Sequence, residues 1–531
     1  MQRSRALDGI RSASEPFDLL IIGGGATGLG AAVDAAALGH RVALIEQADF
    51  AKGTSSRSTK LVHGGVRYLR QGNVSLVLEA LRERGRLARN APHLVHDLAF
   101  VIPTYSWWEG PFYGVGMKVY DHLAGKLGLA PSRVLTREET LSLIPTIATE
   151  HLLGGVVYHD GQFDDARLAI NLAQTAASLG ASLVNYCACV GLIKEQGSLA
   201  GVEARDAETG EEFTIRARVV INATGVFSDA LRRFDEPNSR DLIAASQGIH
   251  LVLPQEFLPG AAAIMIPKTE DGRVLFAVPW HDRVVVGTTD TPRAELSLEP
   301  RSLAAERDFV MEHARHYLAK PPRDQDVLSV YAGLRPLVKS GDGHDTAALS
   351  RDHTIVVSAS GLVTITGGKW TTYRKMAEDA VDQAEMVAGL ENRRSRTDDL
   401  RIHGWAQDAI APKNLQVYGS DAASIASLIK DEPGLASPLH PSLPYQQAEV
   451  VWHARHEMAR TVEDVLARRT RALLLDARAS IEAAPAVARL LAHELKRGVA
   501  WTEAQTRAYA TLARGYIYTD PASVDPKGSG R

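Results

Sequence analysis

The sequence predicts an α/β fold in which a nucleotide-binding domain is interleaved with a mixed-sheet domain and followed by an α-helical domain. Near the N-terminus, a buried-strand pattern leads into a glycine-rich turn and an Ala-rich helix. Strand and helix patterns then alternate without a clean linker to about residue 390, and a helical pattern follows the polar stretch 391–399. The length of 531 residues allows two to four folding units at about 150 residues per domain.

The first of these elements form a βαβ unit. Residues 17–22 (FDLLII) are typical of a buried strand, residues 29–38 of a helix, and residues 42–45 (VALI) of a second strand. The glycine-rich turn lies where the first strand becomes the helix. Since a parallel strand pair needs such a crossover helix, we expect both strands in one parallel sheet of Rossmann-like form.

The turn of this unit has the spacing G-x-G-x-x-G at Gly23, Gly25 and Gly28. Gly23 permits the tight turn, Gly25 lets a pyrophosphate approach the backbone, and Gly28 lets helix and strand pack closely. The N–H groups and the positive dipole end of the helix favour a phosphate there. Glu46 ends the second strand, where its carboxylate can accept hydrogen bonds from a ribose. The order of these elements predicts dinucleotide binding.

The remaining pattern suggests how the domains are divided. Short strand patterns between about 249 and 286 lie far from the βαβ unit and predict a second sheet. The strand at 362–366 then enters Gly367-Gly368-Lys369 and a helix, which returns the chain to the first domain. We therefore assign residues 16–80, 150–240 and 345–390 to the nucleotide-binding domain, 81–149 and 241–344 to a substrate-binding domain, and 400–531 to the helical domain.

Composition excludes several classes of protein. With 45% hydrophobic and 23% charged residues, and 59 Lys+Arg against 63 Asp+Glu, the chain is neither disordered nor a generally basic nucleic-acid binder. No run of about 18 uncharged apolar residues could cross a bilayer. Residues 1–15 lack an apolar signal core, and we expect a disordered extension there. The two cysteines, Cys187 and Cys189, alternate within a predicted strand, so we interpret them as small buried hydrophobes in a reducing compartment.

Four clusters combine glycines or hydroxyls with cationic residues. Residues 54–68 are hydroxyl-rich and then basic, and could form either a phosphate-binding or a solvated loop. His250 lies in an apolar strand, where a structural histidine is more often found than a catalytic one. Arg335 needs an anionic partner, either a substrate or a structural carboxylate. Residues 367–372 form a second glycine turn before a helix, whose N-terminus could face developing negative charge.

The order of these motifs is specific. The chain carries GGGATG at 23–28, TSSRSTKLVHGGVRYL at 54–69, DGQFDDARL at 160–168, NATG at 222–225, GIHLVLP at 248–254, VPW at 278–280, GTTD at 287–290, YAGLRPL at 331–337, SRDHT at 350–354 and GGKWTTYRKMAE at 367–378. It thereby resembles the FAD-dependent glycerol-3-phosphate dehydrogenases, which are flavoproteins of the glycine/D-amino-acid oxidase type. The resemblance covers residues 18–378 and returns at 457–470. The motifs LVHGGVRYL and GGKWTTYR distinguish this family from other flavoproteins, because a generic flavoprotein would share only the βαβ signature and the ATG turn.

The resemblance implies oxidation of sn-glycerol 3-phosphate to dihydroxyacetone phosphate, with FAD reduced and electrons passed to a membrane quinone. It implies Arg67, Tyr68, Arg335, Arg351 and Lys369 as substrate ligands, and His250, Lys369 and Arg335 as catalytic residues; His63 is our own candidate for a further catalytic residue. Arginine forks suit phosphate oxygens, and a neutral histidine suits a base, for which we favour His250 over His63. The predicted FAD ligands are Gly23, Gly25, Ala26, Thr27, Gly28, Glu46, Thr54, Ser55, Ser56, Lys60, Leu61, His63, Val190, Ala223, Thr224, Gly225, Gly368, Lys369, Trp370 and Thr371. No metal site is predicted.

Electron delivery to a quinone requires membrane contact. We therefore expect a cytoplasmic protein that is peripherally associated with the inner face of the cell membrane. We also expect a homodimer. Residues 451–475, which carry Arg455, Arg460, Arg468, Arg469 and Arg471, could form an amphipathic surface or simply a solvated face. The aromatic pairs Trp107-Trp108 and Phe112-Tyr113 could contact lipid, line a pocket or pack in the interior.

One position departs from part of the family. Some members have a Lys-Gly-Ser-His run where this chain reads Gln247-Gly248-Ile249-His250, so one cation that could serve the phosphate is missing. Three alternative functions stay open on sequence alone: a glycerol-3-phosphate oxidase that uses dioxygen, a flavin-dependent amine or amino-acid oxidase with a carboxylate clamp, and an FAD-binding structural or regulatory protein.

Overall fold

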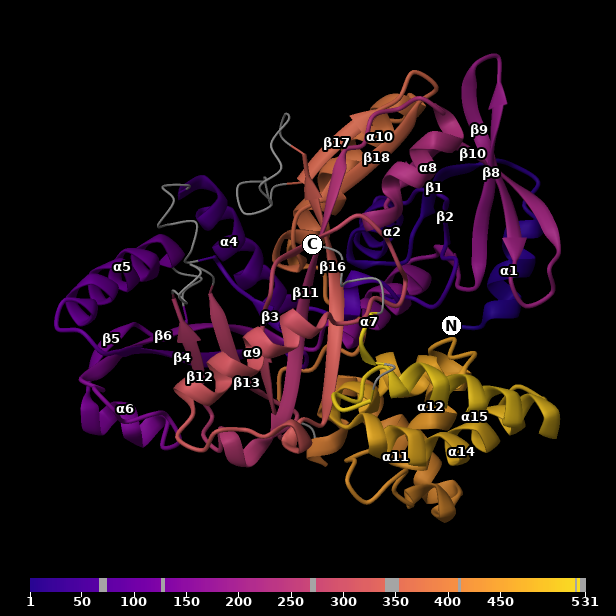
Figure 1. Ribbon diagram of the computed structural model, residues 1–531. Coiled ribbons are helices and arrows are strands. Elements are labelled where there is room, and N and C mark those ends of the chain that lie inside the picture. The colour runs from indigo at the N-terminus through magenta and orange to yellow at the C-terminus, as the bar shows by residue number, and fades with distance from the viewer. Residues whose placement is uncertain are drawn as a thin grey trace.

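The computed structural model describes residues 1–65, 74–125, 129–267, 274–339, 353–408, 412–520 and 523–525. They form two β-sheets and a helical C-terminal unit, and the long strands β11 (Ile243–Pro254) and β16 (Ser329–Val338) run through the middle of the molecule (Figure 1). The predicted α/β class, with a helical domain at the C-terminal end, is confirmed.

The first sheet is mostly parallel. Its order is β17 (His353–Val357), β18 (Leu362–Gly367), β10 (Glu212–Asn222), β1 (Phe17–Ile22), β2 (Val42–Ile45) and β7 (Ser182–Val184). β1 pairs in parallel with both β10 and β2, and β17 is an antiparallel edge strand. Leu19, Leu20 and Ile21 are fully buried because both faces of the sheet are covered, which explains the continuous apolar runs of these strands.

Helices cover one face of this sheet and a β-arm covers the other. α2 (Ala26–Ala37), α7 (Asp165–Ser178) and α10 (Tyr373–Ala388) share a core with Leu19, Ile21 and Val219. On the opposite face lie α8 (Ser228–Asp235) and the antiparallel strands β8 (Cys187–Glu195) and β9 (Ser198–Asp206), which extend β10.

The N-terminal segment is ordered, contrary to the sequence expectation. Residues Arg3–Arg11 form α1, which buries Leu7 and Ile10 against the β-arm side of the first sheet. The guanidinium of Arg3 donates to Asp206 Oδ1 at 2.6 Å and to the carbonyl of Asn185 at 2.9 Å. The expectation of disorder was wrong because the apolar residues of this short helix are covered by strands far away in the sequence.

The second sheet is mixed. Its order is β15 (Thr291–Arg293), β11, β14 (Arg283–Gly287), β13 (Leu275–Trp280), β12 (Ala263–Ile266), β4 (Val95–Thr104), β6 (Gly154–Phe163) and β3 (Leu61–Val62), with β16 beside β11 and β5 (Arg133–Thr136) beside β6. β6 and β3 fall in segments that we assigned to the nucleotide-binding domain. The boundary assignment is corrected here, because β6 pairs with β4 along its whole length, from Gly154 to Phe163.

Two pairs of helices cover the second sheet. α4 (Val74–Asn90) and α5 (Glu109–Ala124) pack on one face through Val77, Leu81, Met117 and Tyr120. The core on the other face includes Val310 and Met311 of α9 (Ala304–Tyr317), and α6 (Arg137–Leu143) contributes Leu141 beside it.

The C-terminal unit consists of α11 (Ala422–Asp431), α12 (Gln447–His456), a π-helical turn at Asp464–Arg469, α13 (Ala472–Leu475), α14 (Ala477–Glu494) and α15 (Val499–Arg514). The arginines of this turn do not form a membrane surface. Arg468 and Arg469 are 2% and 1% exposed, and both bind the carboxylate of Asp49. Burial raises the pKa of Asp49, but Arg469 and Arg468 outweigh it and lower the pKa to about 2.

These buried ion pairs attach the C-terminal unit to the nucleotide-binding sheet. Asp49 follows β2, so its two arginine partners connect the turn at 464–469 to the strand that ends at Ile45. Arg455 and Arg460 lie at the surface but are paired with Glu494 and Glu208. Within the described ranges, no helix combines the length and hydropathy that a membrane crossing needs.

Candidate functional site

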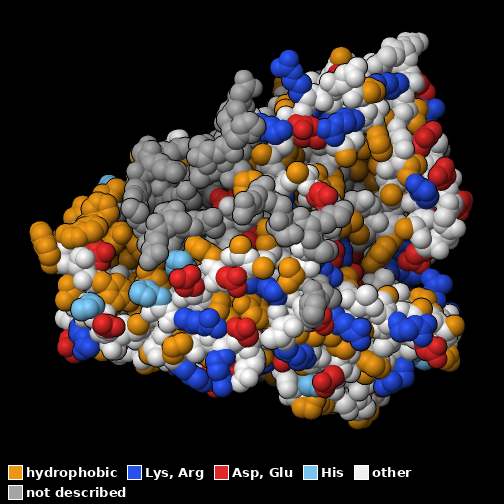
Figure 2. All heavy atoms as spheres, viewed as in Figure 1, with side chains coloured by type: hydrophobic (Ala, Val, Ile, Leu, Met, Phe, Trp, Pro, Cys, Tyr) orange, Lys and Arg blue, Asp and Glu red, His pale blue; other side chains and the backbone are white. Residues whose placement is uncertain are grey.

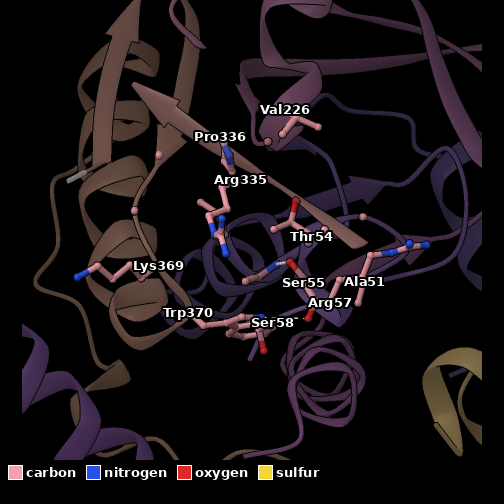
Figure 3. Close-up of a pocket in the computed structure, with 18 of the residues that line it drawn as sticks. Ala51, Thr54, Ser55, Arg57, Ser58, Val226, Arg335, Pro336, Lys369 and Trp370 are labelled. Atoms are coloured by element: carbon pink, nitrogen blue, oxygen red, sulfur yellow. Dashed lines mark hydrogen bonds between the residues drawn. The ribbon is translucent and has the colours of Figure 1, made fainter. Parts of the chain in front are cut away.

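A cavity of about 1080 Å³ is lined by residues of both sheets (Figure 3). One part lies at the carboxyl ends of β1, β2 and β10, where Gly23, Glu46 and Ala223 line it. The other part reaches β11 and β16, where it is lined by His250 and Arg335. Open α/β sheets bind ligands outside the carboxyl ends of their strands, and this cavity has that position.

The glycine turn after β1 is closed to any side chain. Gly23 has φ of +113°, and a Cβ there would meet the carbonyl oxygen of Ala223 at 2.5 Å. A Cβ on Gly28 would lie 1.9 Å from the carbonyl oxygen of Gly23. α2 begins after Gly25 without a side-chain cap, so its first N–H groups face the cavity or Ser55. This backbone cradle fits the pyrophosphate of a dinucleotide.

Glu46 is held at the end of β2. Its Oε2 accepts from the N–H of Gly24 at 2.7 Å, and its Oε1 accepts from the N–H of Ala48 at 2.9 Å. Burial raises the pKa of Glu46, and the hydrogen bonds from these two backbone donors offset only part of this increase. A carboxylate fixed in this way keeps lone pairs for ribose hydroxyls at the cavity wall.

The hydroxyl-rich segment after β2 lies partly inside the cavity and partly behind it. Ser55 Oγ accepts from the N–H of Ala26 at 2.9 Å, and Thr54, Ser55 and Leu61 line the cavity. The predicted ligands Ser56, Lys60 and Val190 do not line it.

Lys60 is turned away from the cavity. Its fully buried ammonium donates to Asp165 Oδ2 at 2.7 Å and to the carbonyl of Ser56 at 2.9 Å. Burial lowers the pKa of Lys60 to about 7, although Asp165 acts in the opposite direction. Its side chain therefore supports the loop from behind the cavity, and the prediction of Lys60 as an FAD ligand is corrected.

A second glycine turn closes the middle of the cavity. Gly367 and Gly368, with φ of +82° and +72°, end β18 and lead toward α10. The indole N–H of Trp370 donates to the carbonyl of Ser55 at 3.0 Å, and Thr371 Oγ1 accepts from the N–H of His63 at 3.2 Å. These bonds join two segments that are about 300 residues apart in the chain. The predicted flavin ligands Gly368–Thr371, His63 and Ala223–Gly225 all line the cavity.

His250 occupies a slot in the second sheet. Its ring stacks on Tyr331, with centroids 4.8 Å apart, and the other side of the slot is open only because position 287 is glycine. A Cβ on Gly287 would lie 2.5 Å from Cδ2 of His250. Nε2 lies 2.9 Å from Thr59 Oγ1. Burial holds the pKa of His250 well below its usual range, and Arg335 and Lys60 lower it further, so the imidazole is neutral at pH 7.

Arg335 faces the same part of the cavity. Nη1 donates to the carbonyl of Thr289 at 2.9 Å, Nη2 donates to Thr288 Oγ1 at 3.0 Å, and Asp290 lies 3.6 Å away. A Cβ on Gly248 would lie 2.2 Å from Nη2, so this glycine makes room for the guanidinium. The Arg335 side chain is 27% exposed, which leaves part of its guanidinium fork accessible to an anion.

The predicted cations are only partly brought together. Figure 3 shows Arg335 reaching toward the centre of the cavity, whereas the side chain of Lys369 extends away from it along the wall. Arg67, Tyr68 and Arg351 lie outside the described residues. Among the described residues, no group of three or more His, Cys, Asp or Glu side chains could hold a metal ion.

Gln247 lies on the face of β11 away from this cavity. Its amide donates to Glu306 Oε2 at 2.7 Å and to the carbonyl of Arg301 at 2.8 Å. Side chains alternate along a strand, so Gly248 and His250 face the cavity while Gln247 does not. A lysine at this position would approach Glu306, and its replacement by glutamine therefore removes no cation from this cavity.

Sequence reasoning missed three neighbours of the candidate base: Thr59, Gly287 and Tyr331. Thr59 lies in the hydroxyl-rich run, but nothing in the local sequence distinguishes it from Ser58 or Ser56. Gly287 and Tyr331 are the first residues of the motifs GTTD and YAGLRPL, in which neither was singled out. Their roles depend on strand register, since His250 lies opposite Gly287 on β14 and opposite Tyr331 on β16.

Comparisons with known proteins agree with this geometry. A family model described as "FAD dependent oxidoreductase" matches residues 18–374, and one described as "C-terminal domain of alpha-glycerophosphate oxidase" matches residues 362–506. A mitochondrial glycerol-3-phosphate dehydrogenase of Arabidopsis thaliana is 40% identical over 96% of this chain and 87% of its own. The mitochondrial glycerol-3-phosphate dehydrogenase of Mus musculus is 39% identical over 94% and 73%.

A solved structure is similar over the whole chain. The glycerol-3-phosphate dehydrogenase of Bacillus halodurans, complexed with FAD, is 29% identical, has a TM-score of 0.79 and covers 100% of this chain and 99% of its own. Glycine oxidase of Geobacillus kaustophilus, at 20% identity and a TM-score of 0.53, shares the fold over 73% of this chain.

Proposed function

This chain belongs to the FAD-dependent glycerol-3-phosphate dehydrogenases, and we propose that His250 is its base, that Arg335 binds the substrate phosphate and that a membrane quinone receives the electrons. The observation that supports the residue roles is the position of a neutral imidazole and a partly exposed guanidinium in the cavity that also contains the glycine cradle. Bound FAD supplies the redox chemistry by accepting hydride from C2 of the substrate.

The protein's own groups handle the proton and the phosphate. A buried imidazole that is neutral at pH 7 can take the C2 hydroxyl proton on a ring nitrogen as the hydride leaves. The Arg335 fork, fixed by Thr288 and Thr289, can bind phosphate oxygens without reorganising. His63 lines the same cavity and is the alternative base.

Three substrates and two electron acceptors test this proposal. The holoenzyme is supplied with sn-glycerol 3-phosphate, glycerol or glycine, and with either a water-soluble quinone or air. We expect turnover with glycerol 3-phosphate and quinone, and much less peroxide than substrate consumed in air. One peroxide per substrate at the quinone-supported rate would instead identify a glycerol-3-phosphate oxidase. Turnover of glycine but not glycerol 3-phosphate would identify an amino-acid oxidase.

The pH dependence tests the state of the base. The groups facing His250 are Arg335, Lys60 and the ring of Tyr331, and both cations add to the effect of burial in lowering its pKa. A lowered pKa keeps the imidazole neutral to lower pH. The limiting rate of flavin reduction at saturating substrate should therefore stay flat from pH 8 to the ordinary histidine pKa of about 6.5 and fall only below it. A rate that is already halved at pH 7 would contradict this assignment.

We propose that the molecule contacts the cytoplasmic face of the membrane through α5. Trp108, Phe112, Val115 and Val119 follow helical spacing and are 47%, 54%, 68% and 45% exposed, and Trp107 precedes them at 83%. Figure 2 shows hydrophobic side chains gathered at the end of the molecule where Figure 1 places α5. Such a stripe of aromatic and aliphatic residues suits insertion at a lipid interface. The homodimer stays a prediction from the sequence.

Binding to vesicles tests this surface. The variant Trp108→Ser/Phe112→Ser should bind unilamellar phosphatidylcholine–phosphatidylglycerol vesicles at least about tenfold more weakly than the wild type, since burying one large apolar side chain contributes about 1.5–3 kcal/mol. Sedimentation with vesicles measures this, and soluble-quinone activity should be unchanged. The matched control, Val357→Ser/Met386→Ser, replaces exposed apolar residues of β17 and α10 and should bind as the wild type does. Equal binding by both variants would exclude α5 as the contact.

A further inference from the structure

The loop that carries Thr59 is fixed on two sides by buried groups. Asp165, at the start of α7, accepts from the N–H of Ser58 at 3.0 Å, from Ser58 Oγ at 2.7 Å and from Lys60 Nζ at 2.7 Å, all through Oδ2. On the other side, the hydroxyl of Tyr331 donates to the carbonyl of Ser58 at 3.0 Å. The residues before and after Thr59 are therefore held, and its side chain has little freedom to move away.

The C-terminal unit supplies a further anchor. Arg471 lies between the π-helical turn and α13, is 1% exposed and donates through Nη2 to Asp165 Oδ1 at 3.0 Å and to the carbonyl of Ser56 at 2.7 Å. Asp165 thus binds Arg471 through one oxygen and the loop through the other. Because the carboxylate is planar and rigid, the position of Arg471 determines where the loop can lie.

Thr59 is the point where this arrangement reaches the candidate base. Its hydroxyl lines the cavity and lies 2.9 Å from Nε2 of His250. Within the described part of the chain, Nδ1 of His250 has no hydrogen-bond partner, so Thr59 supplies the ring's only hydrogen bond there. The partner of one ring nitrogen decides which nitrogen carries the proton and how the ring is turned in its slot.

We propose that Thr59 is a positioning residue that orients the imidazole of His250, and that the C-terminal unit holds Thr59 in place through the Arg471–Asp165 ion pair. This inference rests on the proposed role of His250 as the base. It gives the helical unit a function in the reaction, although none of its described residues lines the cavity.

The hydroxyl is tested by two substitutions in the FAD-loaded full chain. Thr59→Val keeps the volume but removes the hydrogen bond, and Thr59→Ser keeps the hydroxyl. In anaerobic rapid mixing with sn-glycerol 3-phosphate, the valine variant should show a limiting rate of flavin reduction lowered about tenfold or more, a part of the roughly 10²–10⁴-fold that a positioned base contributes. Its substrate dissociation constant should change less than the rate. The serine variant should recover most of the rate.

The pH profile separates positioning from a general structural role. Loss of the Thr59 bond should move the acid midpoint of the limiting rate in the valine variant, whereas the serine variant should keep the wild-type midpoint. A valine variant with the wild-type rate and midpoint would overturn the role of Thr59. So would a serine variant as slow as the valine variant, because it retains the hydroxyl.

The long-range link is tested by Arg471→Lys, which keeps the charge but cannot bind Asp165 and the carbonyl of Ser56 with one fork. Its limiting rate should fall while FAD stays bound, and Arg478→Lys, an exposed control that bonds Thr519, should behave as the wild type. A wild-type rate in Arg471→Lys would overturn the link. If the wild-type enzyme itself is not reduced by sn-glycerol 3-phosphate, the proposed function fails; reduction of the wild type and all variants alike refutes only the present inference.

Discussion

Replacement of His250 by asparagine is expected to slow flavin reduction by sn-glycerol 3-phosphate about 10²–10⁴-fold, the contribution of a positioned general base. Asparagine fits the slot between Tyr331 and Gly287 but cannot take a proton at neutral pH. FAD should remain bound, because the glycine cradle and Glu46 lie at the other part of the cavity. Anaerobic stopped-flow absorbance and the flavin content of the purified variant measure both effects.

Two further histidine variants accompany this measurement. His151→Asn changes an exposed histidine and should leave the rate unchanged. His63→Asn tests the alternative base directly. A larger loss of rate in His63→Asn than in His250→Asn would transfer the role of base to His63.

Replacement of Arg335 by alanine is expected to raise the substrate dissociation constant by about 10- to 100-fold, because hydrogen bonds to a charged group contribute roughly 1.5–3 kcal/mol. Arg335→Lys should lie between alanine and the wild type, since lysine keeps the charge and loses the fork. Removal of the guanidinium also removes one of the two cations that lower the pKa of His250, so the acid limb of the rate should move to higher pH.

Substrate titrations in the same stopped-flow assay measure these constants. Arg315→Ala, which removes an exposed arginine of α9 paired with Asp324, is the control and should bind substrate normally. An Arg335→Ala variant with unaltered substrate affinity would show that the phosphate binds elsewhere in the cavity.

The nucleotide-binding half of the site could be predicted from the sequence because its constraints are local. The turn at Gly23 and Gly28 tolerates no Cβ, and the strand, helix and acidic residue around it follow within 30 residues. The prediction of FAD as cofactor is confirmed by the family to which the chain belongs. The second glycine turn before α10 could be found in the same way.

Features that depend on partners distant in the sequence could not be predicted. β6 looks like any strand next to a helix, and only its pairing with β4 places it in the second sheet. In the sequence, Arg468 and Arg469 are typical of a charged helix face, because their buried partner Asp49 is more than 400 residues away in the chain. The ordering of α1 depends likewise on Asp206 of the β-arm.

The substrate-binding half of the site could be predicted only in part. Alternation along GIHLVLP already places Gly248 and His250 on one face and position 247 on the other, and this explains why glutamine is tolerated there. The neutral state of His250 is different, because it results from burial beside Arg335 and Lys60, which are contributed by separate elements. Strand spacing thus gives the direction of a side chain but not its electrostatic surroundings.

The most direct test of the central claim is an anaerobic titration of the FAD-loaded protein with sn-glycerol 3-phosphate, followed by the absorbance of the flavin. We predict complete bleaching by the substrate and none by glycerol, which lacks the phosphate that we propose Arg335 binds. Flavin that stays oxidised in the presence of excess sn-glycerol 3-phosphate, while FAD remains bound, would contradict it.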